Sequence, residues 1–214
     1  MGVAADGRGE RELLSLERTL GEQGLHLLAG VDEVGRGPLA GPVVVAAVIM
    51  PPGLLLDGVD DSKRLSAGRR QELSERILRA AVAVGAGAAS CREIDRLNIR
   101  RATALAMGRA VARLRPAPQH LLVDGLPVPE LGSGTHTAVV GGDGKVHAIA
   151  CASIVAKVLR DRLMDRLARR YPAYGWERNK GYGTPEHLAA LHRFGLTPHH
   201  RRSFQPVGDL FSTL

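Results

Sequence analysis

Residues 30–42 place two adjacent carboxylates, four glycines and an arginine directly before an apolar run. The segment reads Gly-Val-Asp-Glu-Val-Gly-Arg-Gly-Pro-Leu-Ala-Gly-Pro, and residues 43–50 are all apolar. Short apolar runs rich in β-branched residues and bounded by glycine and proline are typical of buried strands, so we predict strands over 27–34 and 43–50. Acids in a buried strand destabilise the fold unless a positive partner neutralises them, and a divalent cation is the most effective partner. The chain must therefore form a sheet that brings positive charge to Asp32 and Glu33.

Helical and strand-like patterns alternate through the remaining chain. Apolar residues at helical spacing predict helices over 10–20, 94–114, 152–170 and 185–194. Ser66 is suited to cap a further helix, whose inward side chains we expect to be Leu73, Ile77 and Leu78. Short apolar runs predict strands over 81–91 and 120–123, while 137–140 and 146–149 flank 141–144 as a hairpin or tight loop. This order predicts an α/β fold with a central mixed sheet flanked by helices.

The length and composition of the chain suit one domain of ordinary size. It has 214 residues, of which 44% are hydrophobic, enough for a substantial core. We expect one domain over 27–206, a tail and short helix over 1–26, and a tail over 207–214. No apolar stretch reaches the roughly 18 residues that span a bilayer, and the polar N-terminal residues lack a secretory signal pattern. We therefore expect a cytoplasmic monomer without membrane contact.

The two cysteines agree with that compartment. Cys91 and Cys151 lie among small or apolar neighbours and form no C-x-x-C motif. We interpret them as free buried thiols in a reducing cytoplasm.

The net charge of +7 is concentrated near the C-terminal end of the chain. Residues 157–202 contain 11 Lys and Arg against four Asp and Glu, so the remainder holds 18 residues of each sign. A polyanion-binding face requires such a concentration, and a solvated basic helix would produce it too. The charge thus predicts a basic helical C-terminal region that suits a polyanion, and it does not indicate catalysis.

A third acid follows another predicted strand. Asp124 comes directly after residues 120–123, where a lone acid is also a common turn former or helix cap. If the strands are neighbours, Asp32, Glu33 and Asp124 can converge on Mg²⁺ or Mn²⁺, which favour carboxylate oxygens. We therefore predict these three acids as metal ligands and Mn²⁺ or Mg²⁺ as the cofactor.

The other metal-ligand candidates are weaker. Asp143 is a fourth candidate, although the glycines on both sides of it are equally typical of a plain β-turn. The pair His199-His200 lacks the spacing and partners of a zinc site.

The turn Gly35-Arg36-Gly37 offers exposed backbone groups and one fixed positive charge, which suits a phosphate or a sugar. Beside the acid pair, this turn indicates metal-assisted chemistry on a phosphodiester. Its glycines, with Gly41, do not match the spacing of a dinucleotide fingerprint, and no Walker lysine–serine pair is present.

Two further side chains are candidates for substrate contact. Lys63 lies in the polar run 61–66 and can contact a phosphate, although a loop lysine is ordinarily just solvated. Tyr182 lies between two glycines in 179–184, which exposes its ring for stacking on a sugar or base. A tyrosine partly packed on the surface would show the same pattern.

Together these motifs resemble ribonuclease HII. The resemblance covers roughly residues 27–206, and the number of ordered motifs makes it specific. They are Gly-Val-Asp-Glu-Val-Gly-Arg-Gly-Pro-Leu-Ala-Gly-Pro-Val (30–43), Asp-Ser-Lys-Arg-Leu-Ser (61–66), Leu-Val-Asp-Gly (122–125), Ala-Ser-Ile-Val-Ala-Lys-Val-x-Arg-Asp (152–161), Asn-Lys-Gly-Tyr-Gly-Thr (179–184) and His-Arg-Arg-Ser-Phe (200–204).

The resemblance implies an RNase H-like fold and cleavage of the RNA strand in RNA/DNA hybrids, including a single ribonucleotide embedded in duplex DNA. It implies that Asp32, Glu33 and Asp124 bind metal and that Asp143 is the fourth catalytic acid. It also implies that Gly35, Arg36 and Gly37 read the ribose 2′-OH, with Tyr182 at the adjoining deoxyribose. The expected partners are RNA/DNA hybrids and ribonucleotide-containing duplex DNA.

Two other functions stay open on the residues alone. A different metal nuclease or strand-transfer enzyme would share the acids without requiring a 2′-OH. A non-catalytic nucleic-acid-binding module would keep its basic face after removal of the acids.

Overall fold

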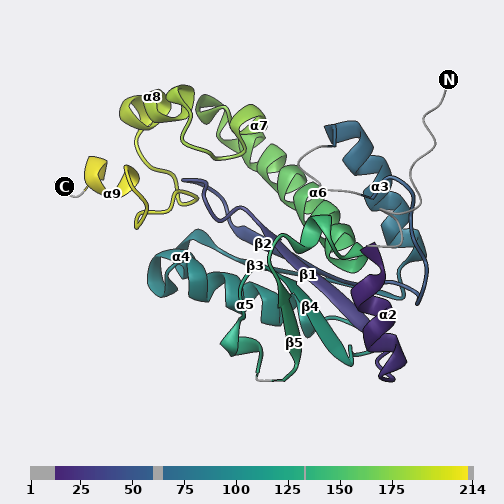
Figure 1. The fold of residues 1–214 in the computed structure, drawn as a ribbon. Coiled ribbons are helices and arrows are strands. Elements are labelled where there is room, and N and C mark those ends of the chain that lie inside the picture. Colours follow the sequence, from purple (N-terminus) through teal and green to yellow (C-terminus); the bar gives the residue numbers. More distant parts are fainter. Residues whose placement is uncertain (1–12, 60–64, 133, 212–214) are drawn as a thin grey trace.

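A mixed β-sheet forms the centre of the molecule (Figure 1). The computed structural model describes residues 13–59, 65–132 and 134–211. Within these residues five strands pair in the order β3-β2-β1-β4-β5. The strands are β1 (Leu28–Val34), β2 (Val43–Ile49), β3 (Ala83–Ala89), β4 (His120–Asp124) and β5 (His136–Val139). Strand β2 is antiparallel to both β1 and β3, whereas β4 is parallel to both β1 and β5. The predicted α/β fold with a mixed sheet is confirmed.

Helices cover both faces of this sheet (Figure 1). The α-helices of the described residues are α2 (Ser15–Glu22), α3 (Ala67–Ala80), α4 (Cys91–Leu97), α5 (Ile99–Val111), α6 (His147–Arg170), α7 (Trp176–Asn179), α8 (Pro185–Phe194) and α9 (Val207–Phe211). Helices α4 and α5 lie on one face, while α6 crosses the other.

Strand β2 is apolar throughout because both of its faces are buried. Val43, Val45 and Ala47 belong to the core cluster shared with α5. Ala46 and Val48 belong to the cluster shared with α3 and α6. Since alternate strand residues point to opposite faces, a strand covered on both sides requires a continuous apolar run.

Close packing of helices on the sheet depends on glycines in the strands. A Cβ at Gly87 in β3 would lie 2.1 Å from the carbonyl oxygen of Ala106 in α5. A Cβ at Gly30 in β1 would lie 2.0 Å from the backbone of Ala148 in α6. The helix that crosses β1 therefore lies directly against the strand that carries the acid pair.

Several sequence-based expectations about local structure were wrong. The predicted helix 94–114 is divided at Asn98, which has φ 67° and caps α5 through a 3.1 Å bond from the Arg101 amide to Oδ1. Residues 146–149 cap and begin α6 instead of forming a strand, because the run of small apolar residues continues into the buried first half of that helix. Leu78 is 49% exposed, whereas Leu73 and Ile77 are buried as expected.

The C-terminal region is helical and packs around its own cluster, which includes Met164, Tyr174, Trp176 and Leu191. This cluster joins the second half of α6 to α8 and to the loop 38–41 after β1. Among the helices that the structure describes, none is long and apolar enough to cross a membrane.

Candidate active site

The acids predicted from the sequence gather where the parallel pairing of β1 and β4 ends. Val31 in β1 is opposite Val123 in β4, so Asp32 and Asp124 follow at neighbouring positions. Asp32 is 6% exposed, and its side chain lies on the face of the sheet covered by α6, where it bonds to Ser153. The sheet register therefore brings together residues that lie far apart in the chain.

The electrostatics of these acids show that they interact. Burial, together with the charges of Glu33 and Asp124, raises the pKa of Asp32 to about 8 despite a hydrogen bond from Ser153. Burial also raises the pKa of Glu33, although Arg36 opposes the shift through a 3.1 Å contact between Arg36 Nη1 and Glu33 Oε1. Arg36 thus stabilises the ionised form of Glu33, whereas burial disfavours the ionised form of Asp32.

The turn that carries Asp143 is attached to the same group. Residues Gly142–Gly144 form a 3₁₀ turn after β5, and Asp143 is 8% exposed within it. The Gly142 amide donates a 2.6 Å hydrogen bond to Asp124 Oδ1. The structure thus brings the fourth predicted acid into the neighbourhood of the other three, on a tight turn, which was one of the two forms we expected for these residues.

The donors in this group fit a hard divalent cation. Among the described residues, no three His, Cys, Asp or Glu side chains stand close enough to enclose an ion in the present side-chain arrangement. The chemistry nevertheless suits Mg²⁺ or Mn²⁺, because the neighbouring ligands are carboxylate oxygens and a cation would relieve the repulsion that raises the pKa of Asp32. His199 and His200 contact aromatic rings, including that of Trp176.

The glycine-rich turn and Tyr182 lie side by side next to these acids. Gly35 adopts φ +91°, and Arg36 and Gly37 are exposed. A Cβ built at Gly37 would lie 3.7 Å from Cε1 of Tyr182, whose residue is 47% exposed. The third substrate-binding candidate, Lys63, lies outside the described residues.

A groove of about 380 Å³ runs beside the acids. Glu33, Arg36 and Asp124 line one part of it, while Arg100 and Thr103 of α5 line another. These two α5 residues were not predicted as site residues, because a threonine and an arginine within a helix carry no sequence signal of their own.

Two arginines that we counted with the polyanion-binding surface are instead fully buried. Arg160 donates to the carbonyls of Ala40, Pro42 and Lys180, over distances of 3.0–3.2 Å. Arg201 donates to the carbonyls of the glycine-rich turn and of Gly41. A count of net charge does not distinguish a buried arginine from an exposed one. The one sequence feature that set these two arginines apart was their position within the motifs 152–161 and 200–204.

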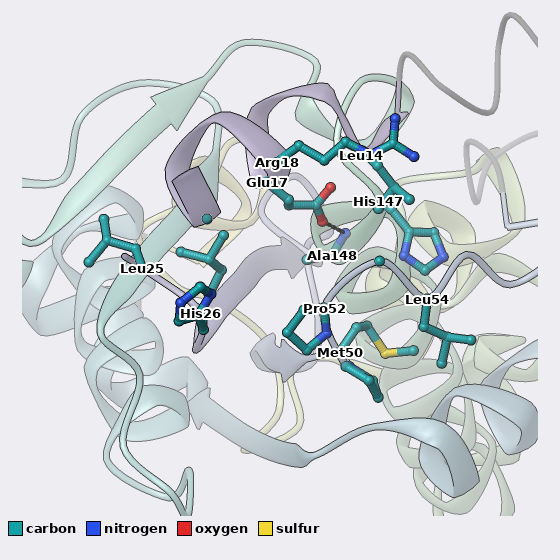
Figure 2. Close-up of a pocket in the computed structure, with 14 residues that line it drawn as sticks. Leu14, Glu17, Arg18, Leu25, His26, Met50, Pro52, Leu54, His147 and Ala148 are labelled. Carbon is teal, nitrogen blue, oxygen red and sulfur yellow. Dashed lines mark hydrogen bonds between the residues drawn. The ribbon is translucent and has the colours of Figure 1, made fainter. Parts of the chain in front are cut away.

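A second cavity lies at the start of α6 (Figure 2). It has a volume of about 130 Å³ and is lined by α2, residues 50–54 and the start of α6. In it the Glu17 carboxylate accepts a 2.9 Å hydrogen bond from the Ala148 amide, which satisfies one free N–H of the α6 N-terminus. None of the predicted site residues lines this cavity.

Comparisons with known proteins agree with the geometry. The family model of ribonuclease HII matches residues 29–207. The chain is 58% identical to ribonuclease HII of Rhodospirillum rubrum over 92% of this chain and 90% of that one. It is 53% identical to ribonuclease HII of a Synechococcus species over 98% and 95% of the two chains.

The solved structures include a similar fold. The crystal structure of ribonuclease H2 from Pyrococcus horikoshii has a TM-score of 0.78 at 27% identity and covers 87% of this chain and 97% of that one. The model match and the relatives each cover most of the chain. This chain therefore belongs to the ribonuclease HII family and is a ribonuclease H of type 2.

Proposed function

We propose that this protein is an endoribonuclease that cleaves the RNA strand of RNA/DNA hybrids and cuts duplex DNA on the 5′ side of a single embedded ribonucleotide. The products would carry 5′-phosphate and 3′-hydroxyl ends. The observation that carries the proposal is the meeting of Asp32, Glu33 and Asp124 where the β1–β4 pairing ends, beside an exposed glycine-rich turn.

Asp32, Glu33 and Asp124 would hold Mg²⁺ or Mn²⁺, and Asp143 would be the fourth acid of the site. When two such ions are bound, they supply an activated water for in-line attack and stabilise the leaving 3′-oxygen. The raised pKa of Asp32 supports this assignment, because a cation would favour the ionised carboxylate that burial and its neighbours disfavour.

The other residues of the site would bind and orient the substrate. Arg36 holds Glu33 in place by their 3.1 Å contact and keeps a positive charge at the edge of the groove. The Gly35-Arg36-Gly37 turn would contact the ribose 2′-OH, because no side chain blocks the approach of a sugar to Gly37. The neighbouring ring of Tyr182 would pack against the adjoining deoxyribose.

Duplex binding would rest on the exposed arginines of the basic C-terminal region. Some cations of this region are engaged in ion pairs, such as Lys157 with Asp161 at 2.7 Å and Lys180 with Asp165. The exposed arginines of α6 (Arg162, Arg166, Arg169 and Arg170) are therefore the best candidates to contact phosphates. All of these groups come from one chain, so we propose that the monomer is active.

The decisive experiment compares three duplexes that differ at one nucleotide. A ribonucleotide, a 2′-O-methyl nucleotide and a deoxynucleotide are placed at the same position, and products are mapped in Mg²⁺ and in Mn²⁺. We expect cleavage of the ribonucleotide duplex alone, at its 5′ flank. Equal cleavage of the deoxy duplex would indicate a general metal nuclease, and binding without cleavage of any duplex would indicate a binding module.

A further inference from the structure

Arg201 is fully buried and its guanidinium points at backbone carbonyls of the loop after β1. Nη1 donates to the carbonyl of Arg36 at 2.7 Å, and Nη2 donates to that of Gly35 at 2.5 Å. Nε and Nη2 both donate to the carbonyl of Gly41, at 3.0 and 2.8 Å. Four of its hydrogen bonds thus converge on three carbonyls of one loop.

Burying the Arg201 guanidinium to bind these loop carbonyls carries a large desolvation cost. A buried guanidinium is costly unless it is paired and fully hydrogen-bonded, and within the described residues no carboxylate forms an ion pair with Arg201. The guanidinium also lies beside the Cys91 thiol and over the ring of Phe204, whose centroid lies 4.9 Å from Cζ. An apolar side chain at this position would join the same segments without that desolvation cost. The polar contacts to Gly35 and Arg36 therefore require an explanation.

The explanation lies in the direction of the two peptide groups. In a trans peptide the N–H points opposite to the C=O, and among the described residues the cis bonds lie elsewhere, at Pro116 and Pro206. Since the carbonyls of Gly35 and Arg36 face Arg201 in the interior, the N–H groups of Arg36 and Gly37 point away from it. Neither of these two N–H groups has a hydrogen-bond partner among the residues that the structure describes.

Two successive N–H groups that point outward form a site for an electron-rich atom. This pair opens next to the Tyr182 ring, which lies 3.7 Å from the position of a Gly37 Cβ. A cation on the carbonyl side of each peptide polarises it and strengthens its N–H as a donor. An oxygen of a sugar packed on the tyrosine would meet both donors.

We propose that Arg201 is a positioning residue for ribonucleotide recognition: it turns the peptides of Gly35 and Arg36 so that the Arg36 and Gly37 N–H groups donate to the 2′-oxygen. This inference rests on the proposed function. In this inference Arg201 does not touch the substrate. It orients and polarises the two N–H donors that contact the substrate.

The test measures binding, so that it does not depend on catalysis. Affinities for a duplex with one ribonucleotide and for the matched all-DNA duplex are measured in EDTA, for the parent protein and for Arg201→Lys and Arg201→Gln. Lysine keeps the charge without the planar fork, and glutamine removes both. We expect the parent to prefer the ribonucleotide duplex by about tenfold, as two neutral hydrogen bonds would give. Both variants should lose that preference while their affinity for all-DNA stays within about twofold.

Two matched variants separate positioning from general stability. Phe204→Leu keeps Arg201 and removes only the ring beneath it, so it should lower the preference partly even if Arg201→Gln does not fold. Ile77→Ala opens the core on α3 and lowers the melting temperature, and it should leave the preference unchanged. Equal loss of the preference in Ile77→Ala, or full preference in Arg201→Lys, would overturn the inference.

The parent protein distinguishes failure of this inference from failure of the proposed function. If it cleaves at ribonucleotides yet binds both duplexes equally without metal, the function stands and the role of Arg201 is wrong. If it neither cleaves nor discriminates, both are wrong.

Discussion

The backbone amide of Gly142 donates a 2.6 Å hydrogen bond to Oδ1 of Asp124, across 18 residues of sequence. A Cβ at Gly142 would lie 3.3 Å from that same oxygen and 2.6 Å from Cδ1 of Ile149. The isoleucine tip can move aside, but the Asp124 carboxylate would also have to shift by a few tenths of an ångström. The orientation of Asp124 thus depends on the absence of a side chain at Gly142.

Gly142→Ala should therefore lower kcat/KM by about ten- to a hundredfold, the usual effect of losing a group that orients a metal ligand. Gly144→Ala is the matched control, because its Cβ would meet no atom within 4 Å. Steady-state kinetics on one ribonucleotide duplex measures both. Similar rates for the two variants would show that the Gly142 contact does not matter.

Asp124→Asn should reduce cleavage by more than about a hundredfold, because an amide replaces an anionic ligand. Without metal the variant should melt at a higher temperature than the parent, since the Asp124 charge raises the pKa of Asp32 and Glu33 by repulsion. Cleavage assays with Mg²⁺ or Mn²⁺ and thermal melts in EDTA test the two effects. Near-normal turnover would remove Asp124 from the metal site.

The two glycines of the Gly35-Arg36-Gly37 turn should respond differently to alanine. At Gly35 the φ of +91° is unfavourable for alanine, and the Cβ would lie 2.0 Å from Nε of Arg160. We expect Gly35→Ala to destabilise the fold by roughly 2–3 kcal/mol. At Gly37 the Cβ makes only an ordinary 3.7 Å contact with Tyr182.

Gly37→Ala should accordingly keep the parent's melting temperature and lose ribonucleotide cleavage. Denaturant unfolding and kcat/KM, recorded for both variants, give the comparison. A large stability loss in Gly37→Ala would mean that the turn is packed more tightly than the structure shows.

Neutralising Arg169 and Arg170 should reduce the salt dependence of duplex binding. Both side chains are exposed at the end of α6, and each phosphate contact contributes about 0.9 to the slope of log K against log salt. Replacing both with glutamine should reduce the magnitude of the slope by up to about 1.8. Replacing Arg76 and Arg79 on α3 removes the same charge elsewhere and should leave the slope unchanged.

Glu17 should make the protein less stable as the pH rises. Burial raises its pKa from 4.5 to about 7, so the folded state holds a proton that the unfolded state has already released between these values. Its contribution is therefore present below about pH 4.5, is lost as the pH rises to about 7, and amounts to up to about 3 kcal/mol.

Glu17→Gln should flatten this part of the stability profile and stabilise the protein at pH 8. Urea unfolding of parent and variant at pH 5 and pH 8 measures the difference. An unchanged difference between the two pH values would show that Glu17 is not responsible.

Local patterns predicted those features that depend on neighbours in the chain. The apolar run before Pro51 predicted β2 because a strand covered on both faces must be apolar along its whole length. The acid pair and the glycine-rich turn were recognisable because acids and glycines, which destabilise a buried strand, lie within a few positions of one another. The prediction of a single helix over 94–114 was wrong, because the positive φ of Asn98 divides the helix while the apolar periodicity continues on both sides.

The sequence by itself determined the five strands of the sheet, the acids and the order of the motifs, and hence the family. The tertiary structure alone decided which of the neighbours Arg201 and Arg202 is buried, and that Gly37 lies beside Tyr182. It also decided that the Gly142 amide reaches Asp124. These relations depend on how distant segments pack, because burial and hydrogen-bond direction are properties of the assembled core. No local pattern of residues encodes them.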